Sequence, residues 1–345
     1  MAQRMTYKAA GVDIALKERL VPLFREIADK TYAAQVIGGV GGFGALVDLR
    51  GARAMRSPVL VAGTDSVGTK LMIAFATGRH DTVGIDCVAM SANDIICHGA
   101  RPLFFLDYIG TGKLNKQIAL DIVKGVARGC AEAGMSLVGG ETAQLSTLYR
   151  PGEYDLAGFA VGIVERARIP DPRSIRAGDV MVGIASSGLH SNGFSLARKV
   201  LLEHARIKLG AFIPELGCTL AEEMLRPTLI YARAAVELFE RFRLKGLANI
   251  TGGGVPENLP RVMPPGLRAV VERGSWTTPP IFKLIQRLGK VSRAEMDRTF
   301  NNGLGMIAIV RARDADRVIA HLRRMEHDAH VVGELRRGKR EVAFA

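Results

Sequence analysis

Gly63-Thr-Asp-Ser-Val-Gly-Thr-Lys70 directly follows the apolar run Pro58-Val-Leu-Val-Ala62. This pattern predicts a buried strand that runs into a glycine-containing turn. The turn would bring together the carboxylate of Asp65, the hydroxyl of Thr69 and the ammonium of Lys70. Backbone N–H groups, a lysine and a carboxylate-held metal are what a polyphosphate needs. The stretch therefore predicts phosphate binding.

The end of this stretch differs from a P-loop. Gly63 and Gly68 have the P-loop separation. However, Thr69 precedes Lys70, and Leu71 stands where a P-loop has Ser or Thr to hold Mg²⁺. Phosphate binding by a route other than that of a Walker-type ATPase is one interpretation. For the octapeptide alone, a strand-to-helix turn without a ligand is the alternative.

Length and composition are those of a globular chain. A chain of 345 residues exceeds a usual single core, so we expect two domains. With 48% hydrophobic and 23% charged residues, it is not expected to be disordered. It contains no apolar run of about 18 residues, the length that a membrane span needs. Residues 1–8 lack the apolar segment of a signal peptide. We expect a cytoplasmic protein that does not associate with a membrane.

The formal net charge of +13 allows a nucleic acid or an anionic small substrate as partner. The charge is spread along the chain, and the one dense basic run is Arg336-Arg-Gly-Lys-Arg340. No nucleic-acid-binding motif accompanies this run, so we expect no nucleic-acid partner. The four cysteines have no metal-ligand spacing, and we expect free thiols.

Strand-like and helix-like segments alternate along the chain, which predicts an α/β or α+β fold. A segment with two prolines at 165–178 is typical of a linker, so we place the domains at residues 1–168 and 169–345. In the first domain we expect strands at 59–63, 102–109 and 154–164, and helices at 81–98 and 117–133. In the second we expect strands at 179–185, 246–251, 303–311 and 330–334, and helices at 192–204, 227–242 and 314–325.

Two further motifs of the first domain could join Asp65. Asn93 and Asp94 lie on an otherwise apolar helix, where an unpaired buried polar group costs about 1–3 kcal/mol. A Mg²⁺ shared with Asp65 would supply a partner; a helix cap or an interhelical hydrogen bond is the alternative. Leu137-Val-Gly-Gly-Glu-Thr142 predicts a short strand that ends in a glycine pair, after which Glu141 offers a hard oxygen to Mg²⁺. An ordinary turn is the alternative there.

Two glycine-rich loops of the second domain each follow a strand and precede a helix. Ser186-Ser-Gly-Leu-His-Ser-Asn-Gly193 offers free N–H groups for phosphate, and its His190 is a candidate acid or base, although a lone histidine is more often structural. Thr251-Gly-Gly-Gly-Val-Pro-Glu-Asn258 repeats the pattern. Thr299-Phe-Asn-Asn-Gly-Leu-Gly-Met306 adds side-chain amides, for which a turn built on Asn-Gly is the alternative. The whole set suits an ATP-dependent enzyme with a second phosphorylated ligand.

Taken together, these motifs resemble the phosphoribosylformylglycinamidine cyclo-ligases, also called aminoimidazole ribonucleotide synthetases. Matching segments occur in the same order along nearly the whole chain: Tyr7–Asp13, Gly38–Gly44, Gly63–Lys70, Arg79–Asp81, Pro102–Tyr108, Val138–Thr142, Ser186–Gly193, Thr251–Pro260 and Arg298–Met306. The resemblance implies a homodimer of two-domain subunits. The first domains would pair their sheets in a dimeric β-barrel, and the second would be a mixed sheet flanked by helices.

The resemblance also implies an ATP-driven ring closure in purine synthesis. ATP would phosphorylate the formamide oxygen of formylglycinamidine ribonucleotide to an iminophosphate. The amidine nitrogen would then attack that carbon and expel phosphate. This route is chemically reasonable because an amide oxygen is a poor leaving group, and phosphoryl transfer needs mainly positioning and charge neutralisation.

Residue roles follow from the resemblance and from side-chain chemistry. Asp65, Asp94 and Glu141 would hold Mg²⁺. His190, Asn192 and Asp94 would serve the reaction. The residues expected to bind ATP or the phosphates are Gly41, Gly42, Asp65, Gly68, Thr69, Lys70, Asn93, Thr142, Ser191, Gly252, Gly253 and Gly254.

Two positions depart from the family pattern. Ser66 stands where the family usually has glycine, and a positive φ there would cost serine about 1 kcal/mol. Arg25 stands where the family tends to have a lysine ahead of the glycine-rich loop, so it keeps the charge but not the lysine geometry.

Other proteins with this general fold are the rival interpretations. They are thiamin-monophosphate kinase, selenophosphate synthetase, the hydrogenase maturation factor and the enzyme of the preceding purine step. A non-catalytic nucleic-acid-associated protein, suggested by the charge alone, is a rival of another class. ATP hydrolysis that depends strictly on formylglycinamidine ribonucleotide would separate the cyclo-ligase from all of these.

Overall fold

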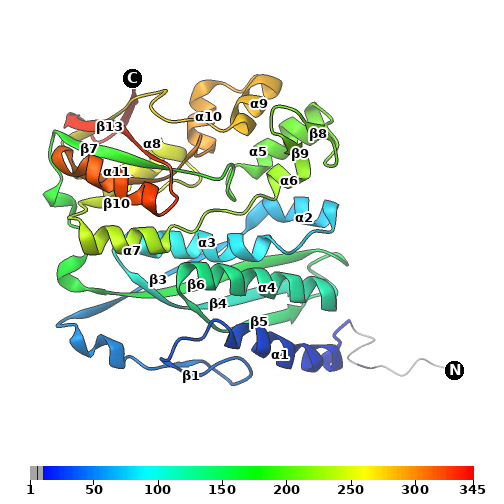
Figure 1. Ribbon diagram of the computed structural model, residues 1–345. Coiled ribbons are helices and arrows are strands. Elements are labelled where there is room, and N and C mark those ends of the chain that lie inside the picture. Colours follow the sequence, from blue (N-terminus) through cyan, green and yellow to red (C-terminus); the bar gives the residue numbers. More distant parts are fainter. Residues whose placement is uncertain (1–5, 7–10) are drawn as a thin grey trace. The chain divides into compact units, whose positions relative to one another are not determined.

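The computed structural model describes Thr6 and residues 11–345 and shows two compact units. Unit 1 holds the described residues up to Ile95 and the segment Arg101–Arg166; unit 2 holds Ile96–Ala100 and Ala167–Ala345 (Figure 1). The predicted match at residues 7–10 lies outside the described residues.

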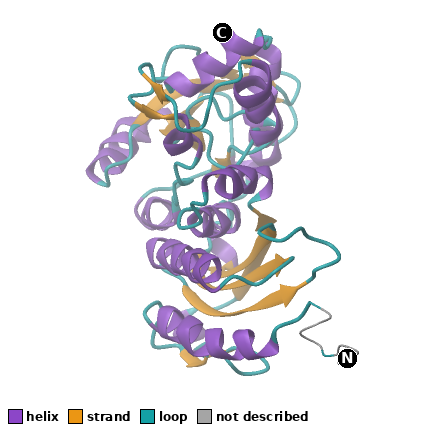
Figure 2. Cartoon of the chain, turned by 90° about the vertical axis from the view of Figure 1, so that its right-hand side faces the viewer, coloured by secondary structure: helices purple, strands orange, loops and turns teal. Residues whose placement is uncertain are grey.

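Unit 1 is built on a four-stranded mixed sheet. The strand order is β3 (Pro58–Ser66), β6 (Tyr154–Glu165), β4 (Arg101–Thr111) and β5 (Ser136–Gln144). β4 and β5 run parallel, and the other pairs are antiparallel. Figures 1 and 2 show these strands as one layer with helices lying along it. The helices that follow β3 and β4 are α2 (Leu71–Thr77), α3 (Val83–Ile96) and α4 (Lys116–Ala133).

The packing of α3 and α4 explains several features of the local sequence. Asn115 caps α4 by accepting hydrogen bonds from the amides of Gln117 and Ile118, and Gly134 ends the helix in the left-handed region. α3 and α4 approach closely where both have glycine. A Cβ added at Gly84 would lie 2.3 Å from the carbonyl oxygen of Ile122. Because no side chain separates the helices there, α3 and α4 can share one face of the sheet.

The opposite face of the unit 1 sheet carries exposed apolar side chains. Leu60 on β3, Phe159 on β6 and Tyr108 on β4 are 57%, 39% and 36% exposed.

Residues outside the sheet form α1 (Ile14–Asp29), β1 (Val36–Gly38), β2 (Leu46–Val47), and the short helices η1 (Arg50–Ala54) and η2 (Gly68–Lys70). α1 packs against α4 and β5.

Unit 2 is built on a six-stranded mixed sheet. Its strand order is β10 (Gly246–Asn249), β12 (Leu304–Arg311), β7 (Asp179–Ala185), β13 (Ala329–Arg337), β11 (Leu267–Val271) and β14 (Val342–Phe344). β8 (Phe212–Ile213) and β9 (Cys218–Thr219) form a small separate hairpin. The helices are α5 (Phe194–Arg198), η5 (Lys199–His204), α6 (Leu220–Met224), α7 (Ala232–Arg241), α8 (Gly254–Asn258), η6 (Leu259–Val262), α9 (Pro280–Gly289), α10 (Arg293–Thr299) and α11 (Ala315–Arg324). Three further single turns are η3 (Arg166–Arg168), η4 (Pro172–Ser174) and η7 (Ala312–Asp314).

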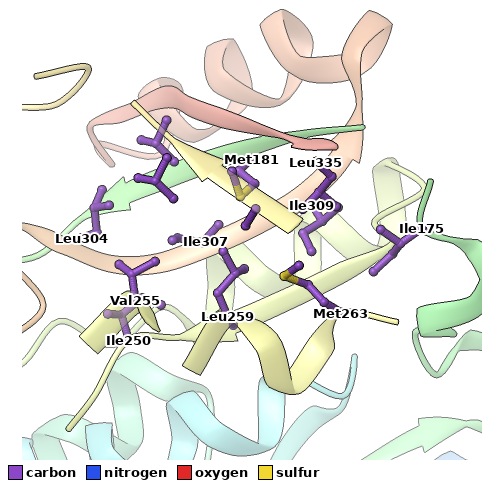
Figure 3. Close-up of a cluster of buried hydrophobic side chains, with 14 of the residues drawn as sticks. Ile175, Met181, Ile250, Val255, Leu259, Met263, Leu304, Ile307, Ile309 and Leu335 are labelled. Atoms are coloured by element: carbon purple, nitrogen blue, oxygen red, sulfur yellow. The ribbon is translucent and has the colours of Figure 1, made fainter. Parts of the chain in front are cut away.

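The core of unit 2 lies between this sheet and the segment that contains α8 and η6. Met181, Ile307 and Ile309 project from β7 and β12 toward Val255 and Leu259, and all five are at least 95% buried (Figure 3). Burying an aliphatic side chain of this size contributes about 1.5–3 kcal/mol, so the cluster stabilises the packing of α8 and η6 against β7 and β12.

The mixed α/β architecture predicted for two domains is confirmed, with local differences. β3 continues through Gly63 to Ser66, and β5 continues through its glycine pair to Gln144, so neither strand ends where the glycines suggested. The helix expected at 227–242 begins only at Ala232. Ser66 does not adopt a positive φ, and the strain considered for it is absent. None of the helices in the described part of the chain is long and apolar enough to cross a membrane.

Candidate functional site

Asp65 and Asp94 form an acidic pair in unit 1. Asp65 lies near the end of β3 on the face that α3 covers, because a Cβ at Gly63, two residues earlier, would lie 3.2 Å from the Ile95 side chain. Burial raises the pKa of Asp65, and the charge of Asp94 raises it further, while the hydrogen bond from the Ser66 amide lowers it. Two carboxylates that repel each other here are suited to binding a cation.

Asn93, next to Asp94 on α3, is 1% exposed, whereas Asp94 itself is exposed. The helix therefore turns the amide inward and the carboxylate outward. Gly68, at the end of the same β3 stretch, has φ +70°, with open space where a Cβ would be. Glycine is required there by conformation and not by crowding.

Lys70 occupies an unexpected position. Its side chain is fully buried, and its Nζ lies 2.9 Å and 2.8 Å from the two carboxylate oxygens of Asp86, which is also fully buried. The Lys70 ammonium, which was expected to neutralise ATP phosphates, is therefore paired with a carboxylate inside unit 1. A phosphate contact by Lys70 stays a prediction, and it would require Lys70 to exchange a buried partner for the ligand.

Glu141 does not join the acidic pair. β3 and β5 are the two edge strands of the sheet, three strand spacings or about 14 Å apart. Glu141 Oε1 instead accepts a hydrogen bond from Lys17 Nζ at 2.8 Å, and both side chains are about half exposed. Within the described residues no three acidic, histidine or cysteine side chains could share a metal. Within one chain, the structure therefore does not bring the three carboxylates together.

Two adjoining cavities lie beside β4 and β5. Their volumes are about 510 Å³ and 250 Å³. Taken together, the two cavities fall within the range of small-molecule sites, which is about 300–1,000 Å³. Gly41 and Gly42 of the glycine-rich loop line both, as do Gly140 and Glu141 of β5, and Thr142 lines the smaller one. Four sequence-predicted site residues, Gly41, Gly42, Glu141 and Thr142, therefore meet at one hollow in unit 1.

The glycine-rich loop Gly38–Gly44 is anchored at Val40, which bonds to Arg25 of α1 and to Tyr32 just beyond the end of that helix. Arg25 Nε donates to the Val40 carbonyl oxygen at 2.7 Å, and the Val40 amide donates to Tyr32 Oη at 3.0 Å. A Cβ at Gly39 would lie 1.7 Å from Tyr32 Oη, and one at Gly41 would lie 2.8 Å from Arg25 Nη2. The loop thus needs both glycines, and Arg25 supports it.

Asp107 is a cavity residue that the sequence interpretation missed. It lies on β4, paired in register with Gly140, and it lines both cavities. Burial raises the pKa of Asp107 to about 7. A Cβ at Gly140 would lie 2.3 Å from Asp107 Oδ1, so this glycine makes room for the carboxyl group. A single charged residue in the apolar run Leu-Phe-Phe-Leu-Asp-Tyr was the signal available in the sequence.

In unit 2, Asn301 organises the Ser186–Gly193 loop. Its Nδ2 donates to the Gly188 carbonyl oxygen at 2.9 Å. Its Oδ1 accepts from Ser186 Oγ at 3.0 Å and from the Gly303 amide at 2.8 Å. The amide predicted at Thr299–Met306 thus supports a second loop as well as its own turn.

His190 is enclosed within this loop. It is 3% exposed and has φ +59°. Its Nε2 accepts a hydrogen bond from the Ser187 amide at 3.2 Å, and its ring centroid lies 6.2 Å from that of Tyr231. Tyr231 Oη in turn donates to the Ala185 carbonyl oxygen at 2.7 Å, where β7 ends. A direct part for His190 in the chemistry stays a prediction, while the structure shows it supporting the loop.

Asn192 and the triple-glycine turn come together. A Cβ at Gly252 would lie 3.6 Å from Asn192 Oδ1. Gly253 and Gly254 have φ +90° and +57°, and a Cβ at Gly254 would lie 1.9 Å from the carbonyl oxygen of Asp297. Asn258 Nδ2 lies within hydrogen-bonding distance of the carbonyl oxygens of Thr251, Gly252 and Gly254.

Ser191 precedes Asn192 in the loop, and its Oγ is buried without a hydrogen-bond partner among the described residues. An unpaired buried hydroxyl costs about 1–3 kcal/mol. Together, the Ser191 hydroxyl, the Asn192 amide and the backbone of Gly252–Gly254 form a neutral polar cluster. Such a cluster can donate hydrogen bonds to phosphate oxygens.

Comparison with known proteins defines the class. The family model "AIR synthase related protein, N-terminal domain" matches residues 46–164, and "AIR synthase related protein, C-terminal domain" matches residues 176–345. The fold and the paired sites thus define an AIR synthase related protein. More particularly, the chain belongs to the phosphoribosylformylglycinamidine cyclo-ligase family. It is 47% identical to the Alkaliphilus metalliredigens cyclo-ligase, covering 99% of this chain and 98% of that protein. It is 50% identical to the Thermoanaerobacter pseudethanolicus cyclo-ligase, covering 96% and 97%.

Solved structures share the fold at low identity. E. coli HypE, a hydrogenase maturation protein, has a TM-score of 0.68 at 19% identity, covering 95% of this chain and 93% of that chain. HypE in complex with ATP has a TM-score of 0.65 at 16% identity, covering 95% and 90%. T. maritima PurL complexed with FGAR has a TM-score of 0.54 at 18% identity, covering 81% and 42%. At these identities the similarity shows a common fold.

Proposed function

We propose that this chain closes the imidazole ring of aminoimidazole ribonucleotide from formylglycinamidine ribonucleotide, with conversion of ATP to ADP and phosphate, in purine biosynthesis. The observation that carries the proposal is identity of 47–50% to cyclo-ligases over nearly the full length of both chains. The rival activities belong to relatives whose similarity is one of fold. The four cysteines are free thiols, which suits a place in the reducing cytoplasm.

We assign the nucleotide to unit 1. The two cavities beside the anchored glycine-rich loop offer backbone N–H groups and an apolar wall that includes Leu106 and Val138. HypE, which shares the fold, has been solved with ATP. Thr142 and the loop glycines Gly41 and Gly42 would contact ATP from the cavity wall, and Thr69 and the backbone at Gly68 would contact it from the end of β3.

Asp65 and Asp94 fit Mg²⁺, because they are two neighbouring carboxylates that repel each other. Magnesium is typically held by one or two carboxylates together with water and phosphate oxygens, so a third protein carboxylate is not needed. When bound, the ion would neutralise phosphate charge during transfer. Asp65 and Asp94 would hold and orient it, and Asn93 would fix this part of α3 from within.

We assign the phosphorylated substrate to unit 2. Gly252–Gly254 would receive the ribose phosphate through backbone N–H groups, and Ser191 and Asn192 would orient the reacting amide. In the first step the formamide oxygen attacks the γ-phosphorus of ATP, and ADP leaves with the electrons of the broken P–O bond. In the second step the amidine nitrogen forms the new C–N bond, and the C–O bond breaks as phosphate leaves. The chain's own residues contribute positioning and charge neutralisation.

The decisive test is a coupled assay of ADP formation with purified protein. ADP release that requires formylglycinamidine ribonucleotide, together with aminoimidazole ribonucleotide detected by mass spectrometry, is expected. ATP hydrolysis that is indifferent to this substrate, or that responds only to thiamin monophosphate or a carbamoyl donor, would contradict the proposal. Salt-sensitive binding of DNA or RNA without ADP formation would instead support the nucleic-acid alternative.

His190→Asn tests the part of His190. Asparagine tolerates the left-handed backbone at φ +59°, so the substitution removes the imidazole with little backbone strain. We expect kcat to fall about 100-fold, in the range typical of a lost acid–base or positioning group. The measurement is steady-state kinetics, with the melting temperature as a control for folding. Near-wild-type kcat would exclude any important role for the ring.

We propose that two copies pair through the open face of the unit 1 sheet. Leu60, Tyr108 and Phe159 form an exposed apolar surface on adjacent strands, and such a surface is typical of an interface. Tyr108 and Phe159 also line the larger cavity, so pairing would place the partner over that cavity. Pairing of two such faces would complete the dimeric β-barrel that the family resemblance implies.

Leu60→Asp, at an interface position that lines neither cavity, is expected to convert the dimer to a monomer, because it buries a charge in the apolar interface. Light scattering coupled to gel filtration measures the mass directly. Phe212→Asp, at an apolar residue of unit 2 that is 62% exposed against 57% for Leu60, is the matched control and should remain dimeric. A wild-type chain that is monomeric at micromolar concentration would refute the pairing.

A further inference from the structure

Unit 2 contains a small basic cavity that the proposed reaction does not use. Its volume is about 70 Å³, and it lies between α9, α10 and the segment that follows β11. The side chains that carry the argument are Arg273, Trp276, Lys283, Gln286, Arg293 and Asp297. None of them belongs to the loops assigned above to ATP or to the substrate.

The charges of this cavity are unbalanced. Asp297 is paired with Arg273, whose Nη2 lies 2.6 Å from Asp297 Oδ2 and whose guanidinium stacks 3.9 Å from the ring centroid of Phe344. Lys283 and Arg293 form no ion pair or hydrogen bond with any described residue. Three cations face one carboxylate, which leaves an excess of two positive charges at one hollow.

The size of the cavity limits the ligand. One buried water needs about 10–15 Å³ of such space, so about 70 Å³ corresponds to roughly five waters. A tetrahedral oxyanion has five heavy atoms and fits, whereas a whole nucleotide does not. Arginine binds phosphate oxygens through its planar fork and lysine as a point charge.

The neutral residues of the wall suit the same ligand. Gln286 offers side-chain N–H donors from α9. Trp276 Nε1 already donates to the Asn302 carbonyl oxygen at 2.9 Å, so the indole acts as a fixed wall and not as a donor. Arg273 and Asn302 both donate to Asp297, which neutralises the one acidic group that would repel an anion.

We propose that this cavity binds a single phosphate group through Lys283, Arg293 and Gln286, either as inorganic phosphate or as the phosphate of a small monoester. The site is distinct from the Gly252–Gly254 turn, although α10 contacts both: the Asp297 carbonyl oxygen abuts Gly254, and the Asp297 side chain lines the cavity. The proposal does not depend on the cyclo-ligase activity.

Trp276 provides the assay, because it is the only tryptophan of the chain and it lines the cavity. We expect inorganic phosphate, titrated into the full-length protein at constant ionic strength, to change tryptophan emission saturably, with a matching heat in calorimetry. Lys283→Gln combined with Arg293→Gln should weaken phosphate binding at least about tenfold, since both charge-assisted contacts are lost. Both residues are exposed, so the variant is expected to fold, and circular dichroism checks this.

Lys208→Gln, at an exposed lysine of unit 2 outside the cavity, is the matched control and should bind phosphate like wild type. Ribose 5-phosphate serves as the second probe: tighter binding than inorganic phosphate assigns the site to a monoester, and weaker binding assigns it to the free ion. Unchanged affinity in the double variant would overturn the proposal. So would the absence of a saturable response in both fluorescence and calorimetry.

Discussion

Asp86→Asn is expected to destabilise unit 1 by about 3–5 kcal/mol. The substitution leaves the Lys70 ammonium fully buried without its carboxylate, and an uncompensated buried charge costs about that much. Lys70 ends η2 and directly precedes α2, and Asp86 lies on α3, so the loss should loosen the end of β3 where Asp65 lies. Urea unfolding followed by hydrogen exchange of peptides from residues 58–96 measures the effect in unit 1 itself, since two units need not unfold together.

Two comparisons make this result specific. Glu132→Gln breaks the exposed pair with Arg128 on α4 and should cost at most about 1 kcal/mol. Lys70→Met combined with Asp86→Leu replaces both charges by apolar groups and should recover more than half of the loss. A single-variant loss below about 1 kcal/mol would mean that Lys70 reaches solvent or another partner when Asp86 is changed.

Lys70 also shows where sequence interpretation stops. The octapeptide Gly63–Lys70 correctly indicated a strand followed by a turn that carries charged and hydroxyl side chains, because residue alternation and glycine placement are local properties of the sequence. Which way the lysine points depends on Asp86, sixteen residues further along the chain. Side-chain direction at the end of a strand is decided by packing with another element, and no local pattern contains that information.

The β5 segment also shows a feature that the local sequence pattern did not predict. Its two glycines suggested the end of a strand, but Gly139 and Gly140 pair with Leu106 and Asp107, and the pairing continues to Gln144 after a register shift between Leu137 and Gly139. Glycine was needed at position 140 because Asp107 occupies the space of a side chain. Close approach of a neighbouring carboxyl group, and not a turn, explains the residue.

The position of Glu141 followed from strand order, which the sequence did not reveal. Three acidic motifs in the first domain suggested one metal site, yet the sheet places β3 and β5 at opposite edges. In contrast, the sequence predicted that the Ser186–Gly193 and Thr251–Asn258 loops each follow a strand and open a helix, and the structure brings Asn192 of the first close to Gly252 of the second. Both loops lie near one edge of the unit 2 sheet because β12 separates β7 from β10.

Asp65→Asn is expected to lower kcat of the ring closure by about 100–1,000-fold while leaving the fold intact. Loss of one carboxylate from the Asp65–Asp94 pair removes charge that would hold Mg²⁺, and charge stabilisation of this kind contributes several kcal/mol to a transition state. The amide preserves the shape of the side chain and relieves the repulsion from Asp94, so stability should stay equal or rise. Steady-state kinetics over a range of Mg²⁺ concentrations is the measurement.

The dependence on Mg²⁺ separates a metal ligand from a merely structural aspartate. If Asp65 binds the ion, the variant should need more Mg²⁺ for half-maximal rate, and calorimetry without substrate should show weaker Mg²⁺–ATP binding. Asp121→Asn, on α4 and hydrogen-bonded only to Gln117 among the described side chains, removes an equal charge from unit 1 and should change neither quantity. Because Glu141 lies at the other edge of the sheet, Glu141→Gln should also leave the Mg²⁺ requirement unchanged. A lowered kcat with an unaltered Mg²⁺ requirement in Asp65→Asn would instead assign the carboxylate to positioning of the β3 turn.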